Sequence, residues 1–128
     1  MNQRIRDRAP IYLDDEFRRE MFDLFPNDPR VAEYLDAGSI GIGQLLSTTL
    51  MRCSYLPPFD ELRRAMQGLH VIRSSEFRGG TGQAQQALKS IEDVLNEQYN
   101  LRRIEPRVRA LSERYIVAER KQQESAYY

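Results

Sequence analysis

A helical repeat of mostly apolar residues dominates the C-terminal part of the chain. Its members follow one another at steps of three or four: Ala87, Ile91, Val94, Gln98, Leu101, Ile104, Val108, Leu111, Tyr115 and Ala118. Such steps place side chains on one narrow stripe of an α-helix. Because an apolar stripe is stable only when it is covered, the repeat predicts a long helix that packs against another surface.

Helix breakers divide the rest of the chain into short segments. Pro26, Gly38, the pair Pro57-Pro58 and the run Gly79-Gly80-Thr81-Gly82 stand between stretches with helical periodicity. The spacing predicts short helices over residues 14–25, 28–37, 43–54 and 59–75, followed by a long pair over 82–104 and 106–123. Pro106 lacks an amide hydrogen, so it must either kink this spine or begin a sixth helix.

No stretch alternates apolar and polar residues over a useful length, and this argues against β-strands. The predicted fold class is therefore all-α, a compact helical bundle of five or six helices with a long, Pro-kinked C-terminal helical spine. With 128 residues the chain has the length of one domain. The expected organisation is an irregular arm over 1–13, short helices over 14–78, the long kinked pair over 81–123 and a tail over 124–128.

Composition narrows the classes of protein to consider. No apolar run approaches the ~20 residues that a membrane-spanning helix needs, so no membrane role is expected. The formal net charge is zero and Cys53 is the one cysteine, which excludes an internal disulfide and fits a reducing compartment. A cytoplasmic location is the expectation.

The zero net charge is the sum of unlike blocks. Residues 14–36 carry eight acidic residues against three arginines, whereas residues 101–128 carry seven basic residues against four acidic ones. Arginine suits bidentate pairing with carboxylates or with phosphates. The basic block could therefore bind nucleic acid, or it could pair with the acidic block, and the opposite signs favour the second interpretation. The candidate nucleic-acid-binding residues are Arg102, Arg103, Arg107, Arg109 and Arg114.

Residue sets that carry out catalysis or hold a metal are sparse in this sequence. His70 is the only histidine and Cys53 the only cysteine, and no HExxH or CxxC spacing occurs. The run Arg78–Gln83 resembles a phosphate-binding loop but lacks the lysine that would follow its last glycine. Residues 30–53 fit a helix-turn-helix poorly, because Tyr34 and Gln44 occupy positions that favour other residue types. No catalytic residue, metal or cofactor is expected, and the chain is predicted not to be an enzyme.

The sequence favours a protein–protein interaction or assembly module. The stripe is longer than the four short helices can cover, so part of it is expected to be buried between copies of the chain, or against another protein. The predicted interface residues are Ile91, Val94, Gln98, Leu101, Val108 and Leu111. Gln98, as a single polar residue in the stripe, would help to fix the register. The alternative function is nucleic-acid binding through the C-terminal arginines.

Overall fold

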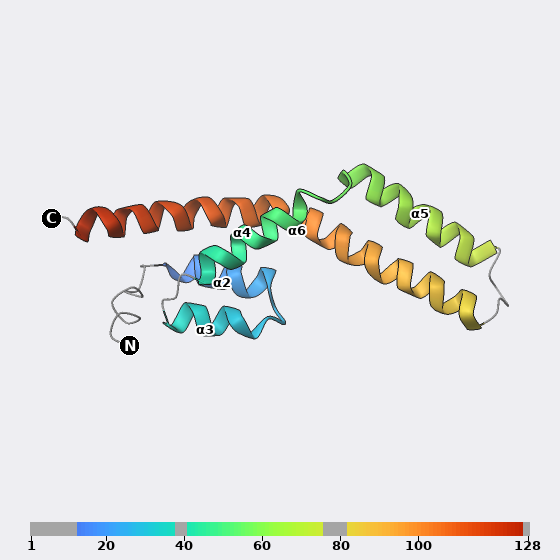
Figure 1. Ribbon diagram of the computed structural model, residues 1–128, viewed down its shortest axis with the longest axis horizontal. Helices are drawn as coiled ribbons and strands as arrows, with labels where there is room; N and C mark the ends of the chain where they lie inside the picture. Colours follow the sequence, from blue (N-terminus) through green and yellow to red (C-terminus); the bar gives the residue numbers. More distant parts are fainter. Residues whose placement is uncertain (1–12, 38–40, 76–81, 127–128) are drawn as a thin grey trace. The chain divides into compact units, whose positions relative to one another are not determined.

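The computed structural model describes residues 13–37, 41–75 and 82–126, and these are folded into helices joined by short connections. The helices, labelled as in Figure 1, are α2 (Asp15–Leu24), α3 (Pro29–Ala37), α4 (Gly41–Cys53), α5 (Phe59–Ser75) and α6 (Gly82–Ala126). The predicted all-α fold is confirmed. Residues 1–12 of the predicted arm and Tyr127 and Tyr128 of the predicted tail lie outside the described residues.

Helix ends are set by the residues that the sequence singles out. The side chain of Asp14 accepts a hydrogen bond from the backbone N–H of Phe17 at 2.8 Å and caps α2. Asp28 does the same for α3, where it accepts from the N–H of Arg30 at 3.0 Å. The guanidinium of Arg30 also donates to this carboxylate, and the hydrogen bond holds the pKa of Asp28 below its usual value.

Pro106 does not begin a sixth helix. It lies inside α6, which is one continuous helix of 45 residues. A proline removes one backbone hydrogen bond from the helix, and its ring crowds the carbonyl group one turn before it. Val108 and Leu111, just after it, are buried at 0% and 2% exposure, so packing holds the helix where the ladder is weakened.

The chain divides into two compact units, each of which includes part of α6. The first, here called the bundle unit, is Met1–Met51 with Pro106–Tyr128, and the second, the hairpin unit, is Arg52–Glu105. The bundle unit has the larger core. Its buried apolar side chains are Phe17, Met21, Leu24, Val31, Leu35, Ile42, Leu45, Leu46, Val108, Leu111 and Tyr115. The expected single domain stays a prediction.

Two glycines of α4 allow tyrosine rings to pack directly on its backbone within the bundle unit. A Cβ atom at Gly41 would lie 2.5 Å from the Tyr34 ring, and one at Gly43 would lie 2.8 Å from Cε1 of Tyr115. No side chain fits at such distances, so these positions require glycine. The close approach brings α4 against both α3 and α6.

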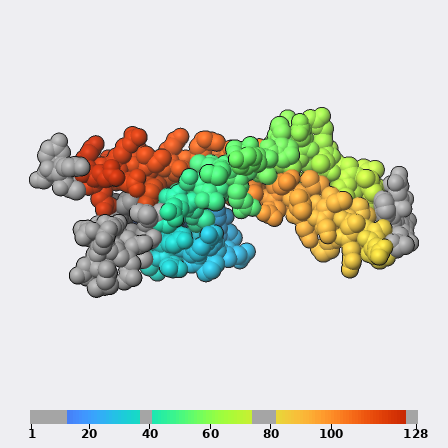
Figure 2. Space-filling model, viewed as in Figure 1, coloured from blue at the N-terminus to red at the C-terminus, as the bar shows by residue number. Residues whose placement is uncertain are grey.

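The hairpin unit consists mainly of α5 and the first part of α6, which run side by side in opposite directions (Figure 1). Figure 2 shows the two helices in contact along their length. The ring centroids of Phe59 and Tyr99 are 4.7 Å apart near one end, and Arg73 forms an ion pair with Glu92 toward the other. The buried apolar side chains here are Cys53, Leu62, Leu69 and Leu88.

None of the helices over residues 13–37, 41–75 and 82–126 is both long and apolar enough to cross a membrane.

Candidate interaction surfaces

The predicted stripe on α6 is covered in the bundle unit. Val108, Leu111 and Tyr115 are 0%, 2% and 5% exposed, because they face the unit's own helices. Two of the six predicted interface residues, Val108 and Leu111, therefore belong to the core of this chain. In this structure they present no surface to a second copy.

The same stripe is uncovered in the hairpin unit. Ile91 is 49% exposed and Val94 is 53% exposed, Ala87 is exposed as well, and Gln98 and Leu101 are half-buried. The contact with α5 is made one position further along, where Leu88 is only 8% exposed. The stripe that the sequence shows most clearly therefore lies beside the line of contact between α5 and α6, here called the seam of the hairpin.

Helix α5 contributes to the same face. Ile72 follows the buried Leu69 by three positions, just as Ile91 follows the buried Leu88. In an antiparallel pair of right-handed helices, equal displacements from the shared seam turn side chains toward the same side. We call this surface the hairpin face. It consists of Ala65, Gly68 and Ile72 on α5 and of Ala87, Ile91, Val94 and Gln98 on α6.

None of the seven residues of the hairpin face is charged, and on α5 the stripe ends at the exposed Glu61, four positions before Ala65. Six of its seven residues are apolar or glycine, and Gln98 is the only polar one. Its three large apolar side chains, Ile72, Ile91 and Val94, are 37%, 49% and 53% exposed. The contribution of α5 escapes sequence analysis, because Ala65, Leu69 and Ile72 read as one apolar side of a helix that is buried throughout.

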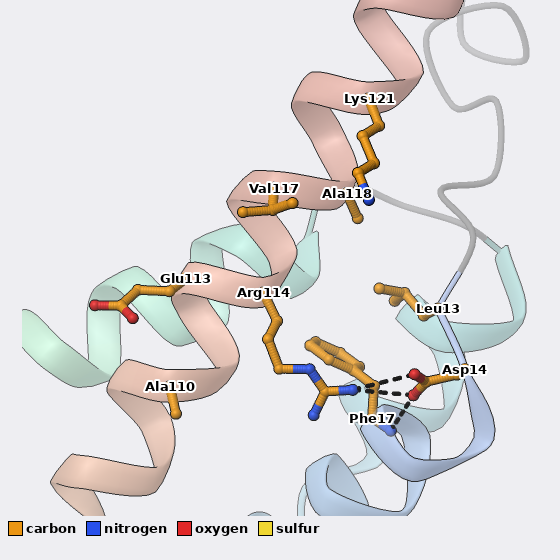
Figure 3. Close-up of a pocket in the computed structure, with 9 residues that line it drawn as sticks. All are labelled: Leu13, Asp14, Phe17, Ala110, Glu113, Arg114, Val117, Ala118 and Lys121. Carbon is orange, nitrogen blue, oxygen red and sulfur yellow. Dashed lines mark hydrogen bonds and ion pairs between the residues drawn. The ribbon is translucent and has the colours of Figure 1, made fainter.

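A second apolar surface lies in the bundle unit, in a groove of about 580 Å³ between α2 and α6 (Figure 3). Phe17, Ala110, Val117 and Ala118 are among the residues that line it, and Leu13 stands at its α2 end. Its charged lining residues are Asp14, Glu113, Arg114 and Lys121. The Nη2 atom of Arg114 donates to both oxygens of Asp14 at 3.0 and 3.2 Å, and its guanidinium lies 5.5 Å from the centre of the Phe17 ring.

A hollow of about 600 Å³ between α4 and α6 has a more polar lining. Its hydroxyl and amide side chains are Gln44, Ser47, Thr48, Ser112 and Tyr115. Within the described part of the chain the Tyr115 hydroxyl is buried without a hydrogen-bond partner. Burial, and after it the charge of Glu119, raises the pKa of Tyr115.

The C-terminal arginines meet the acidic block as the sequence favours. Arg107 donates to the carboxylates of Glu20 and, at 2.5 Å, Asp23, and these bonds raise the pKa of the Arg107 guanidinium. Arg114 pairs with Asp14. Both contacts lie inside the bundle unit, so the two blocks compensate each other there within one chain.

The other three candidate nucleic-acid-binding arginines, Arg102, Arg103 and Arg109, differ in their surroundings. Arg102, in the hairpin unit, pairs with Glu105 at 2.7 Å and donates to the carbonyl oxygens of Leu56 and Pro57. It therefore ties α6 to the connection between α4 and α5. Arg103 and Arg109 are exposed.

The structure gives Cys53 and His70 different environments. Cys53 is 0% exposed, and its thiol donates to the carbonyl oxygen of Leu101 at 3.5 Å, as a packed structural cysteine does. His70 is exposed on α5, beside Met66 and Val71. Over residues 13–37, 41–75 and 82–126, no three His, Cys, Asp or Glu side chains come together in a way that could hold a metal ion.

Comparison of the chain with protein-family models, with curated proteins and with solved structures finds no match.

Proposed function

We propose that this protein is a non-enzymatic assembly module that self-associates through the hairpin face. The observation that carries the proposal is the exposure of Ile91 and Val94 on a helix whose other side is already packed against α5. These residues belong to the stripe from which the sequence predicts an interface. The structure-based proposal moves the contact away from Val108 and Leu111 and adds Ile72 from α5.

The energetic reason is the apolar surface that a two-helix hairpin leaves in water. Full burial of a Val or Ile side chain contributes about 1.5–3 kcal/mol, and the three large side chains of the hairpin face are 37–53% exposed. In a symmetric dimer each copy buries the same residues, so this contribution counts twice. None of the seven residues of the hairpin face is charged, so burying them desolvates no charge of their own.

Nucleic-acid binding through the C-terminal arginines is the weaker candidate function. A phosphate must compete with Glu20 and Asp23 for Arg107 and with Asp14 for Arg114. Displacing these carboxylates would also expose them to the nucleic acid, with which they share a negative charge. Arg103 and Arg109 are exposed, and contacts from two arginines give only weak, salt-sensitive binding.

The experiment compares two matched substitutions on α6. Val94→Asp places a carboxylate on the hairpin face, and Val117→Asp places the same group in the groove of the bundle unit, where Val117 is 49% exposed against 53% for Val94. The solution mass is measured by light scattering over a wide range of protein concentration. We expect the wild type to associate, Val94→Asp to raise the dissociation constant at least about a hundredfold, and Val117→Asp to leave it unchanged.

Two outcomes would overturn the proposal. A wild-type chain that stays monomeric at every concentration shows that the hairpin face does not drive assembly. If Val117→Asp abolishes association and Val94→Asp does not, the interface lies in the groove between α2 and α6. Circular dichroism of both variants checks that the helices are intact, so that a loss of mass is assigned to the interface.

A further inference from the structure

We infer that the second copy docks on the hairpin face by a twofold axis parallel to the helices, so that α5 of each copy packs against α6 of the other, with the closest approach at Gly68. This arrangement rests on the proposed self-association and specifies its geometry. Two independent features of the hairpin unit support it. The first is Gly68, a glycine that packing among the described residues does not explain, and the second is the pair of opposite charges at the edges of the face, Arg64 and Glu97.

Gly68 lies in the middle of α5, where glycine destabilises a helix relative to alanine. Packing among the described residues does not require it, because a Cβ atom built there meets none of their atoms within 4 Å. The glycines at 41 and 43 differ, since tyrosine rings fill the space beside them. The cost at Gly68 is accounted for if a partner's side chain comes against the backbone at this point. Between Ala65 and the protruding Ile72, Gly68 forms a notch in the face.

The same face that carries the notch also carries the side chains that could fill it. Ile91 and Val94 project from α6 and are about half exposed. A twofold interface is formed by one surface meeting itself, so it needs a projection and a matching hollow on that one surface. The hairpin face has both, with the hollow on α5 and the projections on α6. This pairing selects α5 against the partner's α6.

The edges of the hairpin face carry opposite charges. Arg64, one position before Ala65, flanks the stripe on the outer side of α5, and Glu97, one position before Gln98, flanks the stripe on the outer side of α6. Both are exposed; the Glu97 side chain is 64% exposed although it also pairs with Arg52 at 2.6 Å. Edge charges of this kind determine orientation in helical bundles.

The two edge charges also lie at the same height along the hairpin. Met66 lines one hollow together with Leu95 and Asn96, which sets the register between α5 and α6. Arg64 lies two positions before Met66 on α5, and Glu97 lies one or two positions after Asn96 and Leu95 on α6. Because the helices are antiparallel, Arg64 and Glu97 are therefore level with each other. A twofold axis parallel to the helices keeps heights unchanged, so Arg64 of one copy meets Glu97 of the other, twice in each dimer. An axis perpendicular to the helices would instead set α5 on α5 and α6 on α6, so that Arg64 would not meet Glu97.

The notch is tested with Gly68→Ala. Alanine favours the helix, so the thermal midpoint of the dilute, dissociated chain should not fall. The added methyl group obstructs the close approach, and we expect the dissociation constant of the dimer to rise about tenfold. Gln67→Ala, on the side of α5 turned away from the face, is the control and should leave the constant unchanged. If Gly68→Ala associates as tightly as the wild type, the close contact is not at Gly68.

The pairing of α5 with α6 is tested by charge reversal. Arg64→Glu and Glu97→Arg should each raise the dissociation constant roughly tenfold, because each replaces two attractive contacts in the dimer by two repulsive ones. The double variant restores opposite charges across the interface and should return close to the wild-type constant. A double variant no tighter than either single variant would overturn this arrangement.

These outcomes are separable from a failure of the proposed function. If the wild type is monomeric, both the proposed function and this arrangement are wrong. If the wild type associates and Val94→Asp dissociates it, but neither Gly68→Ala nor the charge reversals change the constant, the hairpin face is the interface and the twofold arrangement is wrong.

Discussion

The two parts of α6 carry the same kind of apolar stripe, but the stripe is buried in one part and exposed in the other. In the bundle unit the stripe at Val108 and Leu111 is buried, because several helices surround it. Around Ile91 and Val94, in the hairpin unit, α6 packs against α5, and two helices can cover only one line of side chains on each other. Leu88 occupies that line, so Ile91 and Val94 remain exposed. The number of neighbouring helices thus decides whether an apolar stripe becomes core or surface.

The test with the largest expected effect shortens one apolar side chain in each part of α6. Leu111→Ala removes a side chain that is 2% exposed and leaves a cavity, so we expect the free energy of unfolding to fall by about 2–5 kcal/mol. Val94→Ala, at a half-exposed position, should change it by less than about 0.5 kcal/mol when the chain is dilute enough to be monomeric. Chemical denaturation followed by circular dichroism measures both. Equal losses would show that the stripe of the hairpin unit is also buried within the chain.

A second test uses two helical glycines, Gly43 and Gly68, that the units place in opposite environments. In Gly43→Ala the new methyl group would lie 2.8 Å from Cε1 of Tyr115, so the ring must move and we expect a loss of about 1–3 kcal/mol in unfolding free energy. Gly68→Ala meets open space and should be neutral or stabilising in the monomer. Thermal melts of the dilute variants give both signs. A stabilising Gly43→Ala would contradict the packing of Tyr115 on α4.

Much of the helical framework follows from the sequence. Pro26, Asp28 and Pro29 place the break between α2 and α3 where it is observed, and the predicted helix over 59–75 matches α5. The helix over 43–54 begins two residues early, at Gly41, because nothing in the sequence shows that glycines will be held inside a helix by packing against tyrosine rings. Local rules alone predict that Pro106 kinks the spine or begins a sixth helix, whereas tertiary packing around it keeps α6 continuous.

The candidate site follows from the sequence only in part. Periodicity identifies Ile91 and Val94 as members of an apolar stripe, but it does not show that the true contact with α5 runs through Leu88. The role of Gly68 is also invisible, since a lone glycine in a helical segment gives no sign of what lies beside it. Charge is more informative: the opposite signs of the two blocks anticipate that Arg107 meets Glu20. The exact partners depend on how the helices pack.

The smallest effect expected concerns Tyr115, which lies in the core of the bundle unit. Its hydroxyl is buried without a partner among the described residues, so Tyr115→Phe should raise the free energy of unfolding by up to about 1 kcal/mol at neutral pH. Burial raises the pKa of Tyr115 in the folded chain above the ordinary value of 10.0, which the unfolded chain retains. The folded state therefore holds this proton more tightly, and its stability must fall as the pH rises above 10. Denaturation curves recorded on both sides of that pH should show a smaller alkaline loss for Tyr115→Phe than for the wild type. A variant that is less stable at neutral pH would show that the hydroxyl is bonded in solution.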